Sequence, residues 1–271
     1  MSSIIAVAGG IGDLGRAIVE AILADGKFPV IVLSRKADED REKEIGARIL
    51  PVLEENNVHT VISTLKNMAS MQPELNLIAA ADQAEMTKRY VPSIWGAKFS
   101  RNLEFSAWYP GYFADYYVCP PLKSHLKSMA MVVDVVNNKA GIPGSGNVPV
   151  ALTFTSDLAN GRRRLTHLVG DKLTWNQLVE LAEAVKGVKF DVAYDSIETL
   201  EAGKVTRLPR HRSPYPYISD EQLQPMFAIF GLMFERGVFD FKVENSIAQD
   251  FPDIKLRSMK ELLEEAYKLG V

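Results

Sequence analysis

Three glycines near the N-terminus have the spacing of a dinucleotide-binding turn. They follow an apolar run, Ile4 to Ala8, that reads as a buried strand, and they precede an amphipathic helix over Arg16 to Ala24. In such a unit the first glycine permits a tight turn, the second lets the backbone approach a pyrophosphate, and the third lets helix and strand pack closely. The pyrophosphate then rests on the helix N-terminus. The expected site comprises Gly10, Ile11, Gly12, Asp13, Leu14 and Gly15.

The residues after the second apolar run indicate which dinucleotide binds. An NAD-binding chain normally ends this strand, here Pro29 to Leu33, with an acidic residue that accepts hydrogen bonds from the ribose. This chain has Ser34, Arg35 and Lys36 instead. A guanidinium can bind a 2′-phosphate bidentately and a hydroxyl can donate to it. The pattern favours NADP(H), although Arg35 and Lys36 could instead begin a solvated charged run.

Asp13 is less favourable in this site, because a carboxylate repels a pyrophosphate. We therefore expect its side chain to turn outward and cap the helix.

Apolar runs alternate with helical patterns through the first half of the chain, which is typical of a parallel sheet covered by helices on both faces. The fold class expected is α/β, a doubly wound parallel Rossmann sheet with a smaller, helix-rich substrate domain. Thr64 and Leu65 follow the run from Val58 to Ser63, where such a sheet opens its ligand crevice, and should border the cofactor. The predicted strands are Ile4 to Ala8, Pro29 to Leu33, Val58 to Ser63 and Arg89 to Pro92.

The second half has no glycine-rich phosphate loop but contains three sequences of capping-box form, each before an apolar-periodic stretch. They are Thr174-x-x-Gln177, Ser219-x-x-Gln222 and Ser258-x-x-Glu261. We expect residues 1–117 to form the NADP-binding Rossmann domain, with 148–170 returning to it. Residues 118–147 and 171–271 should form mainly the substrate region.

Composition limits the partners. The chain has 271 residues, a net charge of −3 and a single cysteine, so no intrachain disulfide can form. The charge, and the lack of a basic stripe with aromatics, argue against nucleic acid. No apolar run approaches the roughly 20 residues of a membrane helix, so we expect no membrane association and a cytoplasmic location. The four histidines lack metal-ligand spacing, and no metal site is expected.

Three segments resemble the NmrA-like branch of the atypical short-chain dehydrogenases, which includes isoflavone reductase. The resemblance is strongest to the fungal members of this branch. The first segment, Lys88 to Gly96, is similar to that family's "KRFxPSxFG" sequence. The second, Leu103 to Tyr116, contains a "GxFxDY"-like turn, and the third is Gly170 to Trp175. Together with the glycine turn they extend the resemblance over nearly the whole chain.

The resemblance implies an NADPH-binding domain, a substrate pocket above the nicotinamide, and reduction of a small aromatic or phenolic secondary metabolite. The residues expected to line that pocket are Ser93, Trp95, Tyr109, Tyr112 and Phe113, although the aromatic ones could instead be ordinary core. The family's catalytic lysine lies on a helix between the "PSxFG" segment and the next strand. Here only Ala97 to Asn102 separate Gly96 from Leu103, and this is too short for that helix.

Two further connections look shortened. If Ala47 to Leu50 is a strand, residues 51–57 form too short a crossover to Val58, unless the two strands are not parallel neighbours. Asp157 to Arg164 likewise leaves little room for a helix.

The catalytic residue is therefore left unassigned, and two functions remain open. The first is an NADPH-dependent oxidoreductase. The alternative is a non-catalytic, NADP-binding redox-sensing regulator of the NmrA type with a protein partner, as the family's namesake implies.

Overall fold

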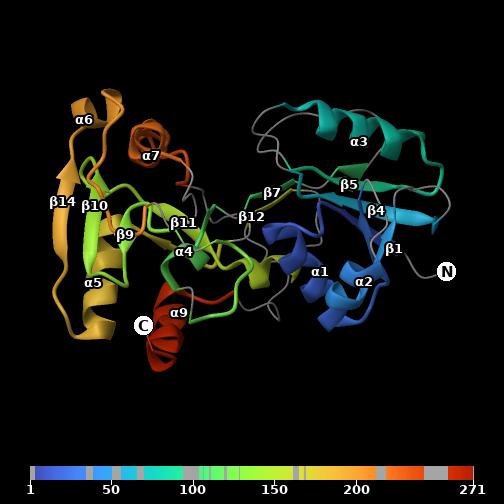
Figure 1. Cartoon of the computed structure of the whole chain (residues 1–271), viewed down its shortest axis with the longest axis horizontal. Coiled ribbons are helices and arrows are strands. Elements are labelled where there is room, and N and C mark those ends of the chain that lie inside the picture. The colour runs from blue at the N-terminus through green and yellow to red at the C-terminus, as the bar shows by residue number, and fades with distance from the viewer. Residues whose placement is uncertain are drawn as a thin grey trace. The chain divides into compact units, whose positions relative to one another are not determined.

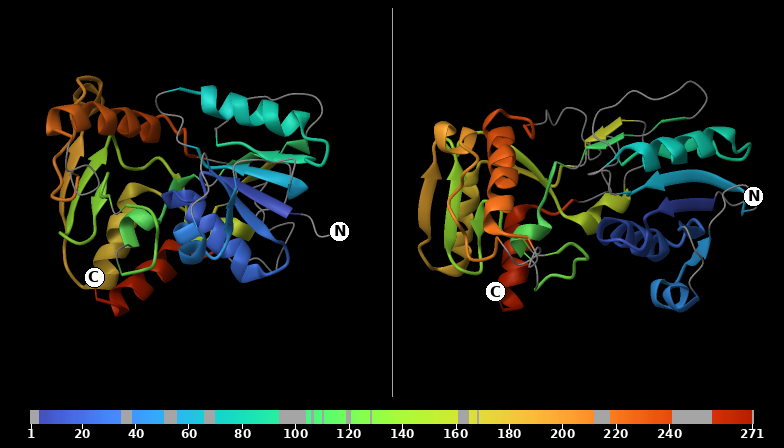
Figure 2. Two further views of the ribbon diagram at one scale, coloured as in Figure 1. Left: turned by 45° about the vertical axis from the view of Figure 1, so that its right-hand side comes forward. Right: turned by 45° about the horizontal axis from the view of Figure 1, so that its top comes forward.

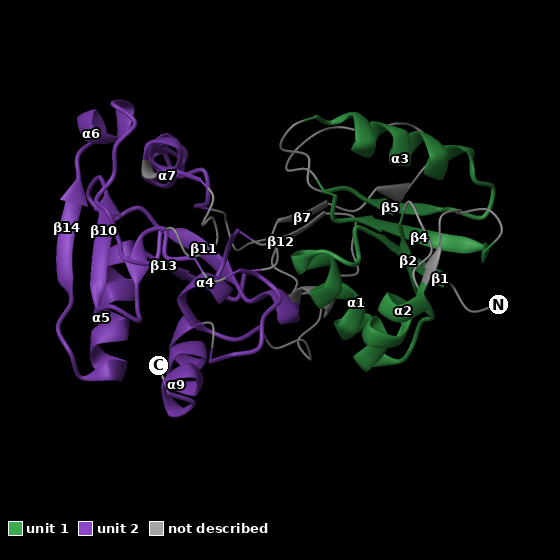
Figure 3. Ribbon diagram, viewed as in Figure 1, with its two compact units in different colours: residues 1–109, 158–166 green, residues 110–157, 167–271 purple. Residues whose placement is uncertain are grey.

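The computed structural model divides the chain into two compact units (Figure 3). Unit 1 comprises Met1–Tyr109 and Leu158–Thr166, and unit 2 comprises Pro110–Asp157 and His167–Val271. The structure describes residues 4–34, 39–50, 56–65, 70–93, 104–105, 107–109, 111–118, 121–127, 129–160, 165–167, 169–211, 218–240 and 256–270. The predicted boundaries of the Rossmann domain, 1–117 with 148–170, stay a prediction.

Unit 1 is built on a six-stranded sheet in the order β3-β2-β1-β4-β5-β6, in which every neighbouring pair is parallel. This is the Rossmann order, and the doubly wound α/β fold expected from the sequence is confirmed. The order reverses between β1 and β4, which places the ligand crevice at the carboxyl ends of these two strands. The strands are β1 (Ile4–Ala8), β2 (Val30–Leu33), β3 (Arg48–Leu50), β4 (Val58–Ser63), β5 (Arg89–Val91) and β6 (Glu104–Phe105).

Helices cover both faces of this sheet. In Figures 1 and 2, α1 (Asp13–Asp25) and α2 (Glu39–Ile45) lie on one face and α3 (Gln72–Gln83) on the other. Successive strand residues point to opposite faces, so Val7 packs with Ile18 of α1 whereas Ala6 packs with Ala81 of α3. The near-continuous apolar strands follow from burial on both sides.

The strand order bears on one of the connections that look too short. β3 pairs with β2 and β4 pairs with β1, so β3 and β4 are not neighbours in the sheet. Both strands nevertheless run parallel in the same sheet, so residues 51–57 remain a short connection between them.

Unit 2 contains two three-stranded sheets as well as the expected helices. The sheet β13-β11-β8 joins Asp171–Leu173, Val150–Thr153 and Tyr112–Phe113. The sheet β14-β10-β9 joins Asp191–Asp195, Lys139–Pro143 and Val133–Asp134. A separate pair, which lies in unit 1 apart from His167, joins β12 (Leu165–His167) to β7 (Ala107–Tyr109).

The helices of unit 2 begin where the sequence placed them. The capping boxes at Thr174, Ser219 and Ser258 are all present, and they start α5 (Trp175–Lys186), α7 (Asp220–Glu235) and α9 (Met259–Lys268). The remaining short helices are α4 (Asp115–Val118), the 3-10 helix η2 (Thr155–Asn160) and α6 (Ile197–Glu201). Among the residues described, no helix has the length and apolarity needed to cross a membrane.

Candidate functional site

The glycine turn after β1 has a backbone that only glycine can complete. Gly12 N donates to Gly9 O at 2.8 Å, and Gly9 lies at φ +78°, a conformation that L side chains rarely adopt. A Cβ at Gly15 would lie 2.3 Å from Gly9 O and 2.6 Å from Thr64 Oγ1. The turn, the helix and the end of β4 therefore approach one another at a distance that excludes even a methyl group.

The helix after this turn starts at an N-cap residue that has no side chain. Its N-cap residue is Gly12, and Arg16 N donates to Gly12 O at 2.8 Å as the first intrahelical bond. An α-helix leaves its first N–H groups without intrahelical acceptors, and these bind anions well. By contrast, α5 is capped by the Thr174 side chain. The prediction that Asp13 caps α1 is wrong, because Asp13 is the first residue of the helix itself, where its carboxylate meets the positive end of the helix dipole.

Thr64 holds the end of β4 against the glycine turn. Its backbone N and its Oγ1 both donate to Ala8 O, at 2.9 and 2.8 Å. Leu65 N lies 3.5 Å from Ser63 Oγ, and both Thr64 and Leu65 are partly buried at the carboxyl edge of the sheet. The structure thus brings Thr64 to the glycine turn at the topological switch point, and Leu65 is the next residue along the chain.

A buried carboxylate that the sequence analysis missed lies behind this edge. Glu74 of α3 is 0% exposed and accepts from Ser63 Oγ at 2.6 Å, Tyr90 OH at 2.9 Å and Ser93 N at 3.0 Å. Ser93 Oγ in turn donates to Leu65 O at 2.9 Å. Burial, and after it the charge of Glu74, raise the pKa of the Tyr90 phenol. A signal was present in the sequence, because Glu74 shares the buried stripe of α3 with Leu77, Ile78 and Ala81.

Of the residues predicted to contact the 2′-phosphate of the adenosine ribose, the structure describes only Ser34. Ser34 follows β2 and is partly exposed, at the strand end where a ribose-contacting residue is expected. Arg35, Lys36 and Trp95 lie outside the described residues.

Of the predicted aromatic lining residues, Tyr112 belongs to the hydrophobic core of unit 2. Tyr112 is 6% exposed and its OH donates to Met131 Sδ at 3.3 Å. Its ring packs against Phe234 at 5.2 Å and Trp175 at 6.3 Å between centroids. Phe113 is half-buried beside Tyr116. Of Tyr109, which lies in β7, only the backbone is described. Little of the Tyr112 ring is left for a ligand, and the pocket-lining roles stay predictions.

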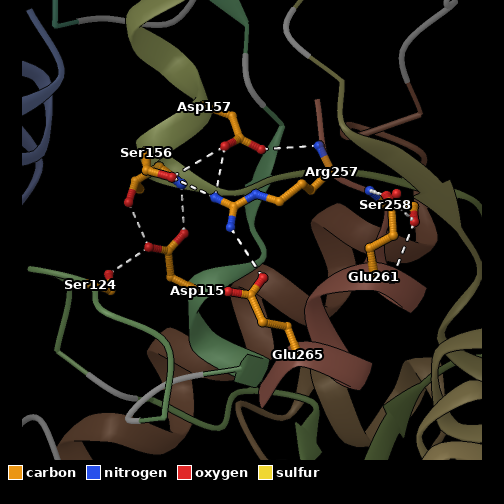
Figure 4. Close-up of polar contacts among 9 residues, drawn as sticks. Asp115, Ser124, Ser156, Asp157, Arg257, Ser258, Glu261 and Glu265 are labelled. Carbon is orange, nitrogen blue, oxygen red and sulfur yellow. Dashed lines mark hydrogen bonds and ion pairs between the residues drawn. The ribbon is translucent and has the colours of Figure 1, made fainter. Parts of the chain in front are cut away.

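The aspartate of the "GxFxDY"-like turn anchors a polar network in unit 2 (Figure 4). Asp115 is 1% exposed and accepts from Ser124 Oγ, Thr155 N and Thr155 Oγ1, at 2.5, 2.9 and 2.6 Å. Burial raises the pKa of Asp115, and these hydrogen bonds oppose the shift. The aspartate of this motif therefore ties α4 to η2.

The second half of this network holds the last helix. The Arg257 guanidinium donates to Asp157 Oδ1 at 2.8 Å and to Ser156 Oγ at 2.6 Å, and Arg257 N donates to Asp157 Oδ2 at 3.1 Å (Figure 4). Arg257 also lies 4.6 Å from the ring centroid of Phe154. Its role in the structure is to dock the start of α9 on η2. Among the described residues no group of three or more His, Cys, Asp or Glu side chains could hold a metal ion.

The curated relatives of the chain are fungal oxidoreductases. It is 26% identical to the oxidoreductase swnN of Metarhizium robertsii over 339 residues, with 98% of each chain covered, and 27% identical to the oxidoreductase BOA1 of Botryotinia fuckeliana, with 92% of this chain and 95% of that protein covered. The swnN alignment is longer than this chain of 271 residues. The relative therefore has internal residues without a counterpart here, in agreement with the short connections. No family model matches the chain.

Solved structures with the same fold include reductases and NmrA. The complex of leucoanthocyanidin reductase with NADPH from Vitis vinifera aligns with a TM-score of 0.71 at 16% identity, covering 97% of this chain and 99% of that one. AtPrR2 with NADP+ and (+)pinoresinol gives 0.68 at 20% identity, covering 97% and 98%. A mutant of NmrA gives 0.63 at 14%, covering 99% and 96%. The resemblance to isoflavone reductase-like and NmrA proteins is thus confirmed in the fold.

Proposed function

We propose that this chain, which has the fold of the isoflavone reductase-like and NmrA proteins, is an NADPH-dependent oxidoreductase that acts on a small aromatic or phenolic metabolite. The observation that carries the proposal is the glycine cradle at the switch point, formed by Gly9 to Gly15 with Thr64. There a Cβ on Gly15 would overlap Gly9 O and Thr64 Oγ1, and the N-cap residue of α1 is Gly12, which has no side chain. The fungal relatives named as oxidoreductases and the NADPH complex of the same fold support it.

Each part of the cradle has a role in holding the dinucleotide. The N-terminus of α1 and the backbone of Gly10 to Gly15 would bind the pyrophosphate. Ser34, with Arg35 and Lys36, would bind the 2′-phosphate of the adenosine ribose. Thr64 and Leu65 would border the cofactor on the β4 side.

Hydride transfer is chemistry that the nicotinamide supplies when bound, so the protein has to position substrate and cofactor and exclude water. We propose that Ser93 borders the reacting ring, because its Oγ and N fix it to Leu65 and Glu74 at this edge.

The test is binding followed by turnover. We expect the purified protein to bind NADPH and to oxidise it in the presence of at least one member of a panel of phenolic enones, ketones and benzylic ethers that includes pinoresinol. Replacing NADPH by NADH should abolish most of this rate, because NADH lacks the 2′-phosphate. Tight NADPH binding with no oxidation across the panel would contradict the reductase proposal while leaving the cofactor assignment intact.

The alternative, an NADP-binding regulator without catalysis, is favoured by one observation. Only residues 92–103 connect β5 to β6, and the family's catalytic lysine lies on a helix in this connection. If the regulator is the correct function, affinity purification with NADP+ should recover a defined protein partner, and recovery should change when NADPH is supplied instead.

A further inference from the structure

The buried carboxylate of Glu74 is the feature of unit 1 that the proposed function leaves unexplained. Its side chain is 0% exposed, and burial of an ionised carboxylate is costly unless hydrogen bonds compensate. All three named partners donate to it, so both oxygens act as acceptors, as in the ionised state. A neutral side chain of similar volume would fill the same space at lower cost, which suggests that the charge itself has a use.

The donors connect Glu74 to the two chain segments at the carboxyl edge of the sheet. Ser63, the last residue of β4, directly precedes Thr64, which packs on the glycine turn. Ser93 follows β5 and is bonded both to Glu74 and to Leu65 O. Glu74 is therefore linked by one hydrogen bond to the end of β4, through Ser63, and by another to the segment after β5, through Ser93.

These segments lie on the side of the glycine turn where the nicotinamide half of a dinucleotide is expected. In a Rossmann sheet the pyrophosphate rests at the turn after β1 and the adenosine ribose at the end of β2. The other half of the cofactor must then extend across the ends of β4 and β5, which are the strands that Ser63 and Ser93 follow.

We propose that Glu74 is a positioning residue whose buried negative charge selects the redox state of the bound cofactor, favouring the oxidised nicotinamide, which carries a positive charge, over the neutral reduced ring. The inference rests on the proposed function, because it requires an NADP(H) site. A charge held in a low-dielectric interior acts over several ångströms. The charge of Glu74 should therefore strengthen the binding of NADP+ while leaving the binding of NADPH nearly unchanged.

The experiment compares the dissociation constants of NADP+ and NADPH for Glu74→Gln and the unchanged protein by titration calorimetry. Gln keeps the size and can still accept from Ser93 N and Tyr90 OH, while the Ser63 hydroxyl can turn to accept from the new amide. We expect NADP+ to bind about three- to tenfold more weakly and NADPH to be nearly unaffected. Glu74→Asp, which keeps the charge, should preserve the ratio of the two constants even if both rise.

Tyr90→Phe is the matched control, because it removes one donor from the same carboxylate and is equally buried. It should lower the melting temperature without changing the ratio. Equal weakening of both cofactor forms by Glu74→Gln, or no weakening, would show that Glu74 is only structural.

If Glu74→Gln fails to fold, the unchanged protein still provides a test. The ¹³C chemical shift of the Glu74 carboxyl, measured by NMR of glutamate-labelled protein and assigned with Glu74→Asp, should change on saturation with NADP+ but not with NADPH. An equal response to both forms would overturn the proposal. Failure of the unchanged protein to bind either form would instead refute the proposed function.

Discussion

At the scale of single residues, Gly15 is the position where a larger side chain would meet a severe steric clash. Two oxygens, Gly9 O and Thr64 Oγ1, occupy the place of a Cβ, and the first belongs to backbone that cannot move aside without opening the turn. Overpacking of this kind typically costs about 1–3 kcal/mol.

We therefore predict that Gly15→Ala lowers both the stability of the protein and its affinity for NADPH. The matched control is Gly187→Ala at the end of α5, where φ is +67° and nothing lies within 4 Å of the new Cβ. This control should cost about 1 kcal/mol of stability through backbone strain alone. Chemical denaturation and fluorescence titration separate the two effects, and unchanged NADPH affinity in Gly15→Ala would contradict the cradle.

Arg35 gives a prediction specific to the 2′-phosphate. Its replacement by Ala should weaken NADP(H) by about 1.5–3 kcal/mol, the value of a charge-assisted hydrogen bond, and leave NAD(H) nearly unchanged. Equal losses for both cofactors, measured by titration, would refute the phosphate assignment.

Asp115 predicts a pH dependence with an unusual sign. Its pKa is raised in the folded protein, chiefly by burial, so the folded state holds this proton more tightly than the unfolded chain. The free energy of unfolding, relative to Asp115→Asn, should therefore be highest below the unfolded pKa of about 3.9. It should fall as pH rises until Asp115 is ionised in the folded state, and then stay level. Urea denaturation of both proteins in steps from pH 4 to 7 measures this difference, and a difference that rises with pH would contradict the prediction.

At the scale of elements, α9 is held by side chains of a segment distant in sequence. The Arg257 contacts to Asp157 and Ser156 join the start of this helix to η2, and its Leu262 and Leu263 are buried in the unit 2 core. A partly buried guanidinium with several hydrogen bonds contributes more than an exposed ion pair.

We predict that Arg257→Ala costs about 2–3 kcal/mol of stability and increases hydrogen exchange across residues 256–270. Arg236→Ala is the control, because the Arg236 to Glu201 pair is 3.8 Å long and largely exposed, and its loss should cost under about 1 kcal/mol. Similar exchange in α9 for both variants would contradict a docking role for Arg257.

The elements also show what the sequence could and could not predict. Strands β1, β2, β4 and β5 were found as apolar runs because burial on both faces makes them continuous, and the three capping boxes located their helices. Strands such as β9, with only Val133 and Asp134, have no periodicity to detect. Glu74 was missed although it shares a helix face with Leu77, Ile78 and Ala81, because a charged residue on a helix is usually solvated. Its hydrogen-bond partners Ser63 and Tyr90 come near only in the folded sheet.

At the scale of the whole molecule, the two units should respond differently to cofactor. Each has its own hydrophobic core, and the glycine cradle belongs to unit 1 alone. A ligand that binds one folded unit stabilises that unit by mass action.

We expect calorimetry to resolve two unfolding transitions. At an NADP+ concentration of 100 times the dissociation constant, the free energy of unfolding of one unit should rise by about 2.7 kcal/mol, and its transition should move to higher temperature. The other should stay in place. Hydrogen exchange of β1 and β14 peptides assigns the transitions to their units. A single transition that moves as a whole would contradict independent unfolding of the units.

The division of the chain also sets the order in which the protein can be completed during synthesis. Unit 1 draws on Met1–Tyr109 and on Leu158–Thr166, and the ribosome delivers residues 110–157 between them. Strand β7 must therefore wait for β12, its partner, while much of unit 2 is being made. The nascent chain can form the glycine turn and its sheet early. Unit 1 is completed only after residues 110–157 of unit 2 and then residues 158–166 have been synthesised.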